Sequence, residues 1–297
     1  MLFQSGTLSL PPQGNVLIAA IPNLSAGADT VERPFELVFL SGSGSTTVLD
    51  KDTNSTFRLV NASPGTYNLD VFLNASTVDA TARQTCDPLT TEAGTFLELC
   101  AVPYTSVGGF NTIDPGSFYV KIQKTDDAAV AAESLLDSVA AGAASTAVLT
   151  GLIADTATTT TIGLHPVLGG RRIATAAQLR LVDVSLAGNA AIAGDPTTDQ
   201  LAVYITEPGA SLAGETADFS GFQFGSDSGY VSMVADNYQV TVAIVDTATP
   251  DAPPQILLTE EVALADSGIY TLLIADSTGG VQPLQYLSID DDPFPPP

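Results

Sequence analysis

The sequence has few of the residues that most often carry chemistry. Its 297 residues include no tryptophan, one histidine and two cysteines, and only 9 lysines and arginines stand against 33 aspartates and glutamates. The formal net charge of -24 repels polyanions, so nucleic acids and anionic lipid surfaces are unsuitable partners. No glycine-rich phosphate loop and no metal-ligand spacing of His or Cys occurs. We therefore predict a protein that is not an enzyme, with no catalytic residues, no metal and no cofactor.

Long apolar runs are also missing. No stretch of 18 or more apolar residues occurs, so we predict no membrane span. The opening MLFQSG has neither a basic n-region nor a long apolar h-region, and we expect any export signal to be removed from this sequence or never part of it. The acidic residues are scattered, which is typical of a solvated acidic surface over an apolar core.

The two cysteines, Cys86 and Cys100, bracket a segment that begins with turn residues and ends with alternating apolar residues. A local disulfide is the economical interpretation. Closing a loop of about 15 residues would stabilise the fold by about 3 kcal/mol in the chain-entropy model, and the bond persists only in an oxidising compartment. A metal pair or a catalytic thiol is the alternative, although no histidine or third cysteine lies nearby. We predict the disulfide, and with it an exported protein that is extracellular or on the cell surface.

Short segments that alternate in polarity dominate the chain, and Gly, Pro, Asn or Asp bounds them. They are STFRLV (55–60), YNLDVFL (67–73), FYVKI (118–122), QLAVYI (200–205), YQVTVAIV (238–245) and IYTLLIA (269–275). This pattern predicts an all-β fold, organised as two tandem antiparallel β-sandwich domains of Ig-like or Greek-key type with extra N-terminal strands.

One Ala-rich segment, residues 126–143, has apolar residues at helical spacing. Its counterpart in the second half of the chain, residues 251–268, contains Pro253 and Pro254, which do not fit inside a helix. We therefore predict strands in both segments.

An internal repeat is indicated by nearly constant offsets between matching segments. Four pairs of segments carry it: RLV at 58–60 and 180–182 (offset 122), the alternating positions of 118–122 and 238–242 (120), LIAD at 152–155 and 273–276 (121), and LDVFLN at 69–74 with LAVYIT at 201–206 (132). The larger last offset is explained by an insertion around residues 190–199.

The segments FRLVNASPGTYNLDVFLN (57–74), IDPGSFYVKI (113–122) and AASTAVLTGLIAD (143–155) support a resemblance. Together they resemble the secreted prokaryotic family known as domain of unknown function 4397, over roughly residues 56–170. A weaker second copy, at roughly 177–290, lacks the Asn-Ala-Ser-Pro and Pro-Gly turns. The resemblance implies an exported prokaryotic β-sandwich, often in tandem, with no established catalytic residues.

These observations divide the chain into four parts. They are N-terminal strands (1–55), a first sandwich repeat (56–170), a linker (171–177) and a second sandwich repeat with a proline-rich tail (178–297). In the first part, NVLIAAI (15–21) is a continuous apolar run, typical of a strand buried on both faces, and 34–50 predicts two strands around a Gly-Ser turn. These strands either complete the first sandwich, form a small third sheet, or are donated to the open sheet edge of a neighbouring subunit.

Weaker candidates for a site each have a simpler interpretation. Asp50, Asp52 and Asn54 have the oxygen spacing of a calcium loop, but the later positions of that loop do not match, and a hairpin turn uses the same residues. His165 is expected to be a loop or linker histidine. Arg171 and Arg172 either fix the angle between the repeats, contact an acidic neighbouring subunit, or lie in a solvated linker.

The functional hypothesis is an extracellular structural or interaction protein, a self-assembling cell-surface or filament subunit that uses β-strand complementation. Its partner would be further copies of itself, joined head to tail, or a cell-surface molecule. The alternative is a monomeric binding or adhesion module for a glycan, calcium or a protein receptor.

Overall fold

A computed structural model gives the fold. It describes residues 3–5, 16–22, 35–41, 44–51, 53–65, 67–74, 84–87, 95–125, 131–151, 163–168, 175–192, 198–249, 252–278 and 283–291. These residues form five β-sheets and one short helix, α1 (Leu186–Ala191). The prediction of an all-β protein is confirmed.

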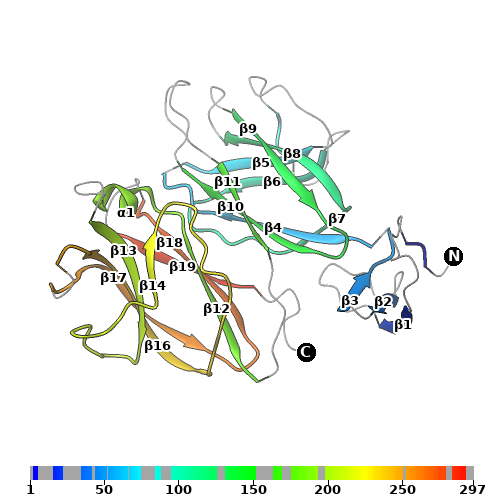
Figure 1. The fold of residues 1–297 in the computed structure, drawn as a ribbon. Helices are drawn as coiled ribbons and strands as arrows, with labels where there is room; N and C mark the ends of the chain where they lie inside the picture. The colour runs from blue at the N-terminus through cyan, green and yellow to red at the C-terminus, as the bar shows by residue number, and fades with distance from the viewer. Residues whose placement is uncertain are drawn as a thin grey trace.

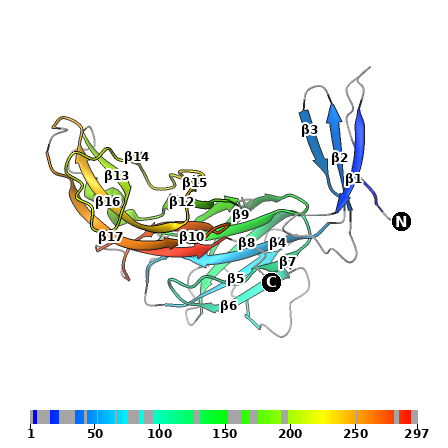
Figure 2. The same cartoon turned by 90° about the horizontal axis from the view of Figure 1, so that it is seen from below.

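The N-terminal strands form a sheet of their own. The strands β1 (Leu17–Pro22), β2 (Phe35–Ser41) and β3 (Gly44–Val48) pair antiparallel in the order β1-β2-β3. Figures 1 and 2 show this N-terminal sheet standing to one side of the other four. Of the three arrangements expected from the sequence, the structure has the small third sheet.

The next eight strands, which we call the first unit, make two four-stranded sheets. The sheet orders are β11-β10-β4-β7 and β6-β5-β8-β9. The strands are β4 (Ser55–Asn61), β5 (Leu69–Asn74), β6 (Thr95–Val102), β7 (Asn111–Ile113), β8 (Gly116–Lys124), β9 (Ala131–Val139), β10 (Ala144–Thr150) and β11 (Gly163–Leu168).

The last eight strands, the second unit, repeat this arrangement. The sheet orders are β15-β12-β18-β19 and β14-β13-β16-β17. The strands are β12 (Ala177–Asp183), β13 (Asp199–Thr206), β14 (Phe219–Phe222), β15 (Val231–Met233), β16 (Asp236–Asp246), β17 (Gln255–Leu264), β18 (Ile269–Ala275) and β19 (Gln285–Asp290). Strands β9 and β17 occupy the two segments in which a helix was considered and strands were predicted, and that prediction is confirmed.

The alternation of polarity in the sequence builds one core inside each unit. In β8, Phe118, Val120 and Ile122 point inward to the first core, and in β16, Val240 and Val242 point inward to the second. Residues at alternate positions of a strand lie on one face, so the remaining positions of these strands form the outer faces of the two units.

Strand pairing tests the repeat offsets. Val71 pairs with Ile122 in the first unit and Val203 with Val242 in the second, which confirms the offsets of 132 and 120. The offset of 121 is wrong for β10 and β18: Arg58 pairs with Thr146, whereas the equivalent Arg180 pairs with Thr271, an offset of 125. LIAD at 152–155 lies outside the described residues, so the structure does not test its match to 273–276.

Two strand pairs correct the antiparallel prediction. Strand β4 runs parallel to β10, and β12 runs parallel to β18. After β4 or β12 the chain passes through strands of the unit's other sheet before it returns to the first sheet at β10 or β18. The returning strand runs in the same direction as β4 or β12, so each of these pairs is parallel. The other strand pairs between the described residues are antiparallel.

The two units pack against each other through the sheets that contain β4 and β12. Their facing side chains form a third apolar cluster, made by Val60, Ala62, Val148, Val182, Val184, Leu273, Ala275, Leu287 and Ile289. These inner sheets are therefore apolar on both faces, one toward the unit's own core and one toward the other unit. Burying each aliphatic side chain contributes roughly 1.5–3 kcal/mol, so the interface fixes the two units as one body.

The sequence predicted an insertion around residues 190–199 but not the helix α1. Ser185 caps the helix by accepting a hydrogen bond from the backbone N–H of Gly188. The side chain of Asp276 also accepts hydrogen bonds from the backbone N–H groups of Leu186 and Ala187. The hydrogen bonds to Asp276, which follows β18 far along the chain, are not visible in the local sequence.

Candidate functional site

The N-terminal sheet exposes apolar side chains on both of its faces. Leu17 pairs with Leu40 on one face, and Ile18 and Phe35 lie on the other. Their exposed fractions are 64%, 40%, 53% and 42%, and they are four of nine large exposed apolar residues among the described positions. The prediction that the run at 15–21 is buried on both faces is wrong for a single chain, because Leu17, Ile18 and Ala20 of this run are exposed.

Strand β1 is also an open edge of that sheet. It pairs with β2 on one side only, and its residues, LIAAIP, carry no charge. The whole three-stranded sheet contains one charged residue, Glu36, and that side chain is buried. Natural edge strands usually carry charges that discourage pairing with another chain, and β1 has none.

The predicted calcium positions form a turn that holds the N-terminus. The buried carboxylate of Asp50 accepts a hydrogen bond from the backbone N–H of Gln4 at 2.6 Å, and the Lys51 N–H donates to the Gln4 carbonyl. The Thr53 N–H closes a turn onto the Asp50 carbonyl. The structure thus supports the turn at this position, while Asp52 lies outside the described residues.

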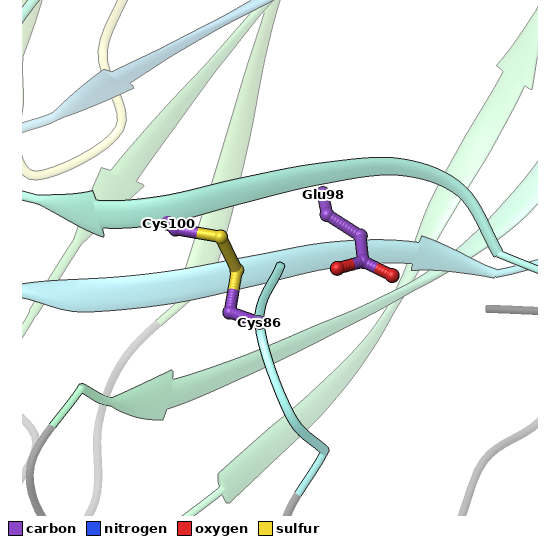
Figure 3. A group of neighbouring side chains, drawn as sticks. All are labelled: Cys86, Glu98 and Cys100. Carbon is purple, nitrogen blue, oxygen red and sulfur yellow. A yellow bond between two sulfur atoms is a disulfide. The ribbon is translucent and has the colours of Figure 1, made fainter. Parts of the chain in front are cut away.

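Cys86 and Cys100 form a disulfide, as the sequence predicted, with Cα atoms 5.7 Å apart. Figure 3 shows the bond joining the segment 84–87 to β6, with Glu98 beside it. The Glu98 carboxylate accepts a hydrogen bond from the backbone N–H of Asp87 at 3.0 Å, so two contacts hold the segment in place. A disulfide is compatible with an extracellular or cell-surface location.

These three side chains offer ligand atoms within 4.8 Å of one another, the spacing of a metal site. Cysteine binds metals as a thiolate, however, and neither sulfur of a disulfide is one. In this state the group is a crosslink, and Glu98 serves the backbone of the clamped segment.

The clamped segment covers the outer face of the first unit. The amide of Gln84 exchanges two hydrogen bonds with the side chain of Gln123, through the Gln84 N–H and carbonyl at 3.1 and 2.7 Å. Gln123 also donates to the carboxylate of Asp70, which accepts a further bond from Thr125. Phe72 beneath them is fully buried. Polar groups on this face are therefore satisfied from within the chain.

A buried ion pair joins the two units. Arg58 of β4 contacts the carboxylate of Asp291 at the end of β19, and its guanidinium stacks on the Phe110 ring at 4.4 Å. Burial lowers the pKa of Arg58, while Asp291 acts in the opposite direction. Tyr230 and Thr271 of the second unit also donate to Asp291.

The equivalent arginine of the second unit pairs with a carboxylate of its own unit. Arg180 forms a two-point bond with Asp227, at 2.9 and 2.7 Å, and stacks on Tyr230 at 4.8 Å. The pKa of Arg180 is raised: burial lowers it, but the bond and the charge of Asp227 outweigh burial. The sequence carried a signal for both pairs, since an arginine recurs in the middle of an apolar strand at an offset of 122.

A second polar contact between the units surrounds Asp276. The Tyr104 hydroxyl of the first unit donates to the Asp276 carbonyl, and Gln285 donates to the same carbonyl and to the Tyr104 oxygen. Burial raises the pKa of Tyr104 to about 12. Nearby, burial raises the pKa of Asp183 to about 6, although Ser185 and Asn189 donate hydrogen bonds to its carboxylate.

Other positions named from the sequence do not gather into a site. His165 lies in β11, opposite Val148, and not in a loop or linker as expected, because the strand extends further than its apolar pattern suggested. Arg171 and Arg172 lie outside the described residues. Among the described residues, no helix is long and apolar enough to cross a membrane.

Comparisons with known proteins give one family match. Residues 191–297 match the model of the family "Domain of unknown function (DUF4397)". The match falls on the second unit, where the sequence reading found the weaker resemblance. No curated protein matches the chain.

Two solved structures show faint likeness. A protein from Bacteroides eggerthii, provisionally described as a cell adhesion protein, has 8% identity and a TM-score of 0.19, with 80% of this chain and 95% of that one covered. A leucine-rich repeat protein from Bacteroides thetaiotaomicron has 11% identity and a TM-score of 0.15, with 78% of this chain and 27% of that one covered. With such scores these likenesses support no conclusion about function. The family match is likewise confined to residues 191–297 and leaves the rest of the chain unmatched.

Proposed function

We propose that this protein is a non-enzymatic extracellular interaction protein whose copies join head to tail by β-strand addition. The observation that carries the proposal is the uncharged, apolar edge strand β1, in a sheet with apolar side chains exposed on both faces. Apolar side chains that stay in contact with water lower their free energy when another layer covers them, so a second layer or strand would stabilise this sheet. Large exposed apolar surfaces of this kind commonly mark contacts with other chains.

The acceptor in this proposal is the edge strand β17 of a neighbouring copy. In the first unit β9 lies against β11 and closes the side between the two sheets. In the second unit, that side contains a cavity of about 180 Å³ lined by residues of β17, β18 and β19, including Val262, Leu272 and Tyr286. The buried Tyr286 hydroxyl has no hydrogen-bond partner among the described residues. A strand added to β17 could place an apolar side chain over this cavity.

Heterologous contact of this kind leaves a donor and an acceptor free at opposite ends, so it builds a filament rather than a closed ring. The proposal includes the finer view of the fold, in which the two units are copies of one Ig-like or Greek-key sandwich. Their equal strand orders and equivalent registers support that view.

Charge sets a condition on assembly. With a net charge of -24, copies of the chain repel each other, and salt screens that repulsion within about 10 Å at 0.1 M. We expect the fraction of assembled protein to rise between about 0.05 and 0.5 M sodium chloride. Assembly that weakens with salt would contradict an apolar contact between like-charged chains.

Sedimentation velocity of the full chain tests the proposal. Ile18→Glu adds a negative charge to the donor strand β1, and Ala263→Glu adds one to the exposed face of the acceptor strand β17. The control is Val234→Glu, which adds the same charge at an apolar residue elsewhere that is 75% exposed. We expect the first two variants to remain monomers and the third to assemble like the unaltered protein. Equal assembly of all four proteins would refute the proposal.

Mixing the two defective variants distinguishes strand addition between different edges from symmetric contact. The Ile18→Glu chain retains its acceptor and the Ala263→Glu chain retains its donor, so an equal mixture should give dimers that grow no further. Association of identical β1 edges would instead let the Ala263→Glu chains pair with one another and leave the Ile18→Glu chains monomeric.

A further inference from the structure

The outer face of the second unit is hollowed where the same face of the first unit is covered. A groove of about 880 Å³ lies over β13, β14 and β16. Its floor includes Tyr204, Gln239 and Thr241, and the equivalent positions of the first unit lie on the face beneath the segment 84–87. A volume in this range is typical of sites for small ligands.

The first wall of the groove is a preformed loop between β13 and β14. The loop turns at Gly209 and Gly214, both with positive φ, where a side chain would be strained. The Gly209 N–H donates to the side-chain oxygen of Gln239 at 3.0 Å, and Leu212 packs toward the apolar cluster around Tyr204.

The second wall is the hairpin that joins β16 to β17. The carboxylate of Asp246 accepts hydrogen bonds from the Ala248 N–H and the Thr249 hydroxyl, at 2.8 and 2.5 Å. These hydrogen bonds lower the pKa of Asp246, so it stays ionised. Pro253 and Ile256 add exposed apolar surface at the mouth. Hydrogen bonds within the chain thus hold described residues of both walls, which limits the ordering cost of binding.

The polar groups of the groove suit an uncharged ligand. Tyr204 lines the groove and is only 6% exposed, so its side chain forms part of the floor. Ser220 and Gln239 add uncharged hydrogen-bonding groups, and the charged residues of the lining are the acids Glu215 and Asp246. The lining contains no lysine, arginine or histidine, so it would repel anionic ligands and offer them no counter-charge.

We propose that this groove binds an uncharged oligosaccharide. Hydroxyl, amide and carboxylate groups match the hydroxyls of a sugar as donors and acceptors, and Pro253, Ile256 and Val245 match the apolar C–H faces of its rings. Ile256 at the start of β17 lines the groove, but the groove shares no lining residue with the cavity at the acceptor edge of β17, so it gives the protein a ligand that assembly does not require.

Titration of the full chain with cellotriose, maltotriose and triacetylchitotriose, followed by saturation-transfer NMR and calorimetry, tests the proposal. At least one of these neutral trisaccharides should bind. Tyr204→Phe removes the hydroxyl of a residue that lines the groove and should weaken binding about fivefold, the effect of one neutral hydrogen bond. Ser220→Trp and Ala213→Trp fill the groove from different sides and should each abolish binding.

Matched controls come from exposed or equivalent positions outside the groove. Tyr119→Phe removes a hydroxyl at the first-unit position equivalent to Gln239, and Ser232→Trp adds the same bulk to an exposed serine of β15. Both should bind like the unaltered chain. The Ile18→Glu chain should also bind unchanged, which separates this proposal from the proposed assembly.

Three results would overturn the inference. They are no binding of any neutral trisaccharide, binding that survives both tryptophan variants, and binding of trilysine in the groove in place of the sugars. The last result would assign the groove to a cationic segment attracted by Glu215 and Asp246. A heparin tetrasaccharide, as an anionic probe, should not bind in the groove.

Discussion

The outer faces of the two units share a strand framework but differ in what lies on it. In the first unit Phe72 is fully buried beneath a segment held by the Cys86–Cys100 disulfide. In the second unit its equivalent, Tyr204, lines an open groove. The strands conserve shape in both units, while the connecting segments decide whether a face is closed or available for binding.

The inner faces differ in a second way. Arg58 is paired with Asp291 of the other unit, whereas the equivalent Arg180 is paired with Asp227 of its own unit. The same residue at the same strand position therefore joins the units in one case and braces a single unit in the other. The three predictions below address these differences.

The largest effect is expected from Arg58→Ala. This change leaves the carboxylate of Asp291 buried near Tyr230 without its cation, which costs about 3–5 kcal/mol. The matched change Arg180→Ala should cost about 1–2 kcal/mol, because the side chain of Asp227 is 29% exposed and water can replace the arginine. Urea unfolding of the full chains measures both. Equal losses of unfolding free energy in the two variants would contradict this difference between the two arginines.

Removal of the disulfide should act on the first unit alone. The double change Cys86→Ser and Cys100→Ser should lower the free energy of unfolding of that unit by about 3 kcal/mol. This is the loss of loop-closure entropy expected for two cysteines with a sequence separation of 14. Amide exchange should accelerate in β5 and β8 and stay unchanged in β13 and β16. Similar acceleration in both pairs of strands would contradict a local clamp.

A pH dependence should be specific to the second unit. The pKa of Asp183 is raised from an ordinary value of 3.8 to about 6, so between these values the folded state binds more protons than the unfolded state. Stability should therefore fall by about 2–3 kcal/mol as the pH rises from 4 to 7.

The first unit provides the control substitution for this effect. Asn61 occupies the position equivalent to Asp183 and accepts the same hydrogen bond, from Ser63 at 3.0 Å. Asp183→Asn should remove this component of the pH dependence, measured as the difference from the unaltered protein in urea unfolding at pH 4.5 and 7. Asp246→Asn, at an exposed position, should not. A difference that persists in Asp183→Asn would refute the assignment.

The sequence was sufficient for features that depend on local pattern. Alternation in segments such as 118–122 and 238–242 predicted strands, and Pro253 and Pro254 in the second copy correctly favoured strand over helix at 126–143 as well as at 251–268. The 14-residue spacing of Cys86 and Cys100 was likewise enough for the disulfide.

Features that depend on distant partners could not be predicted. Two further hydrogen bonds from the first turn of α1 go to Asp276, ninety residues after Leu186, and the partner of Arg58 lies 233 residues away. The parallel pairing of β4 with β10 depends on the path of the chain between them, which alternation does not encode. The groove depends on the shape of two loops, so its polar residues were not distinguishable from solvated turns.

Amide hydrogen exchange of β1 at rising protein concentration tests the proposed function most directly. If copies join through this edge, the β1 amides that face away from β2 should gain protection with concentration, together with those at the outer edge of β17, and Ile18→Glu should abolish the gain at β1. The outer edge of β3 should show no such change. Exchange in β1 and β17 that is independent of concentration, in conditions where the protein assembles, would contradict strand addition.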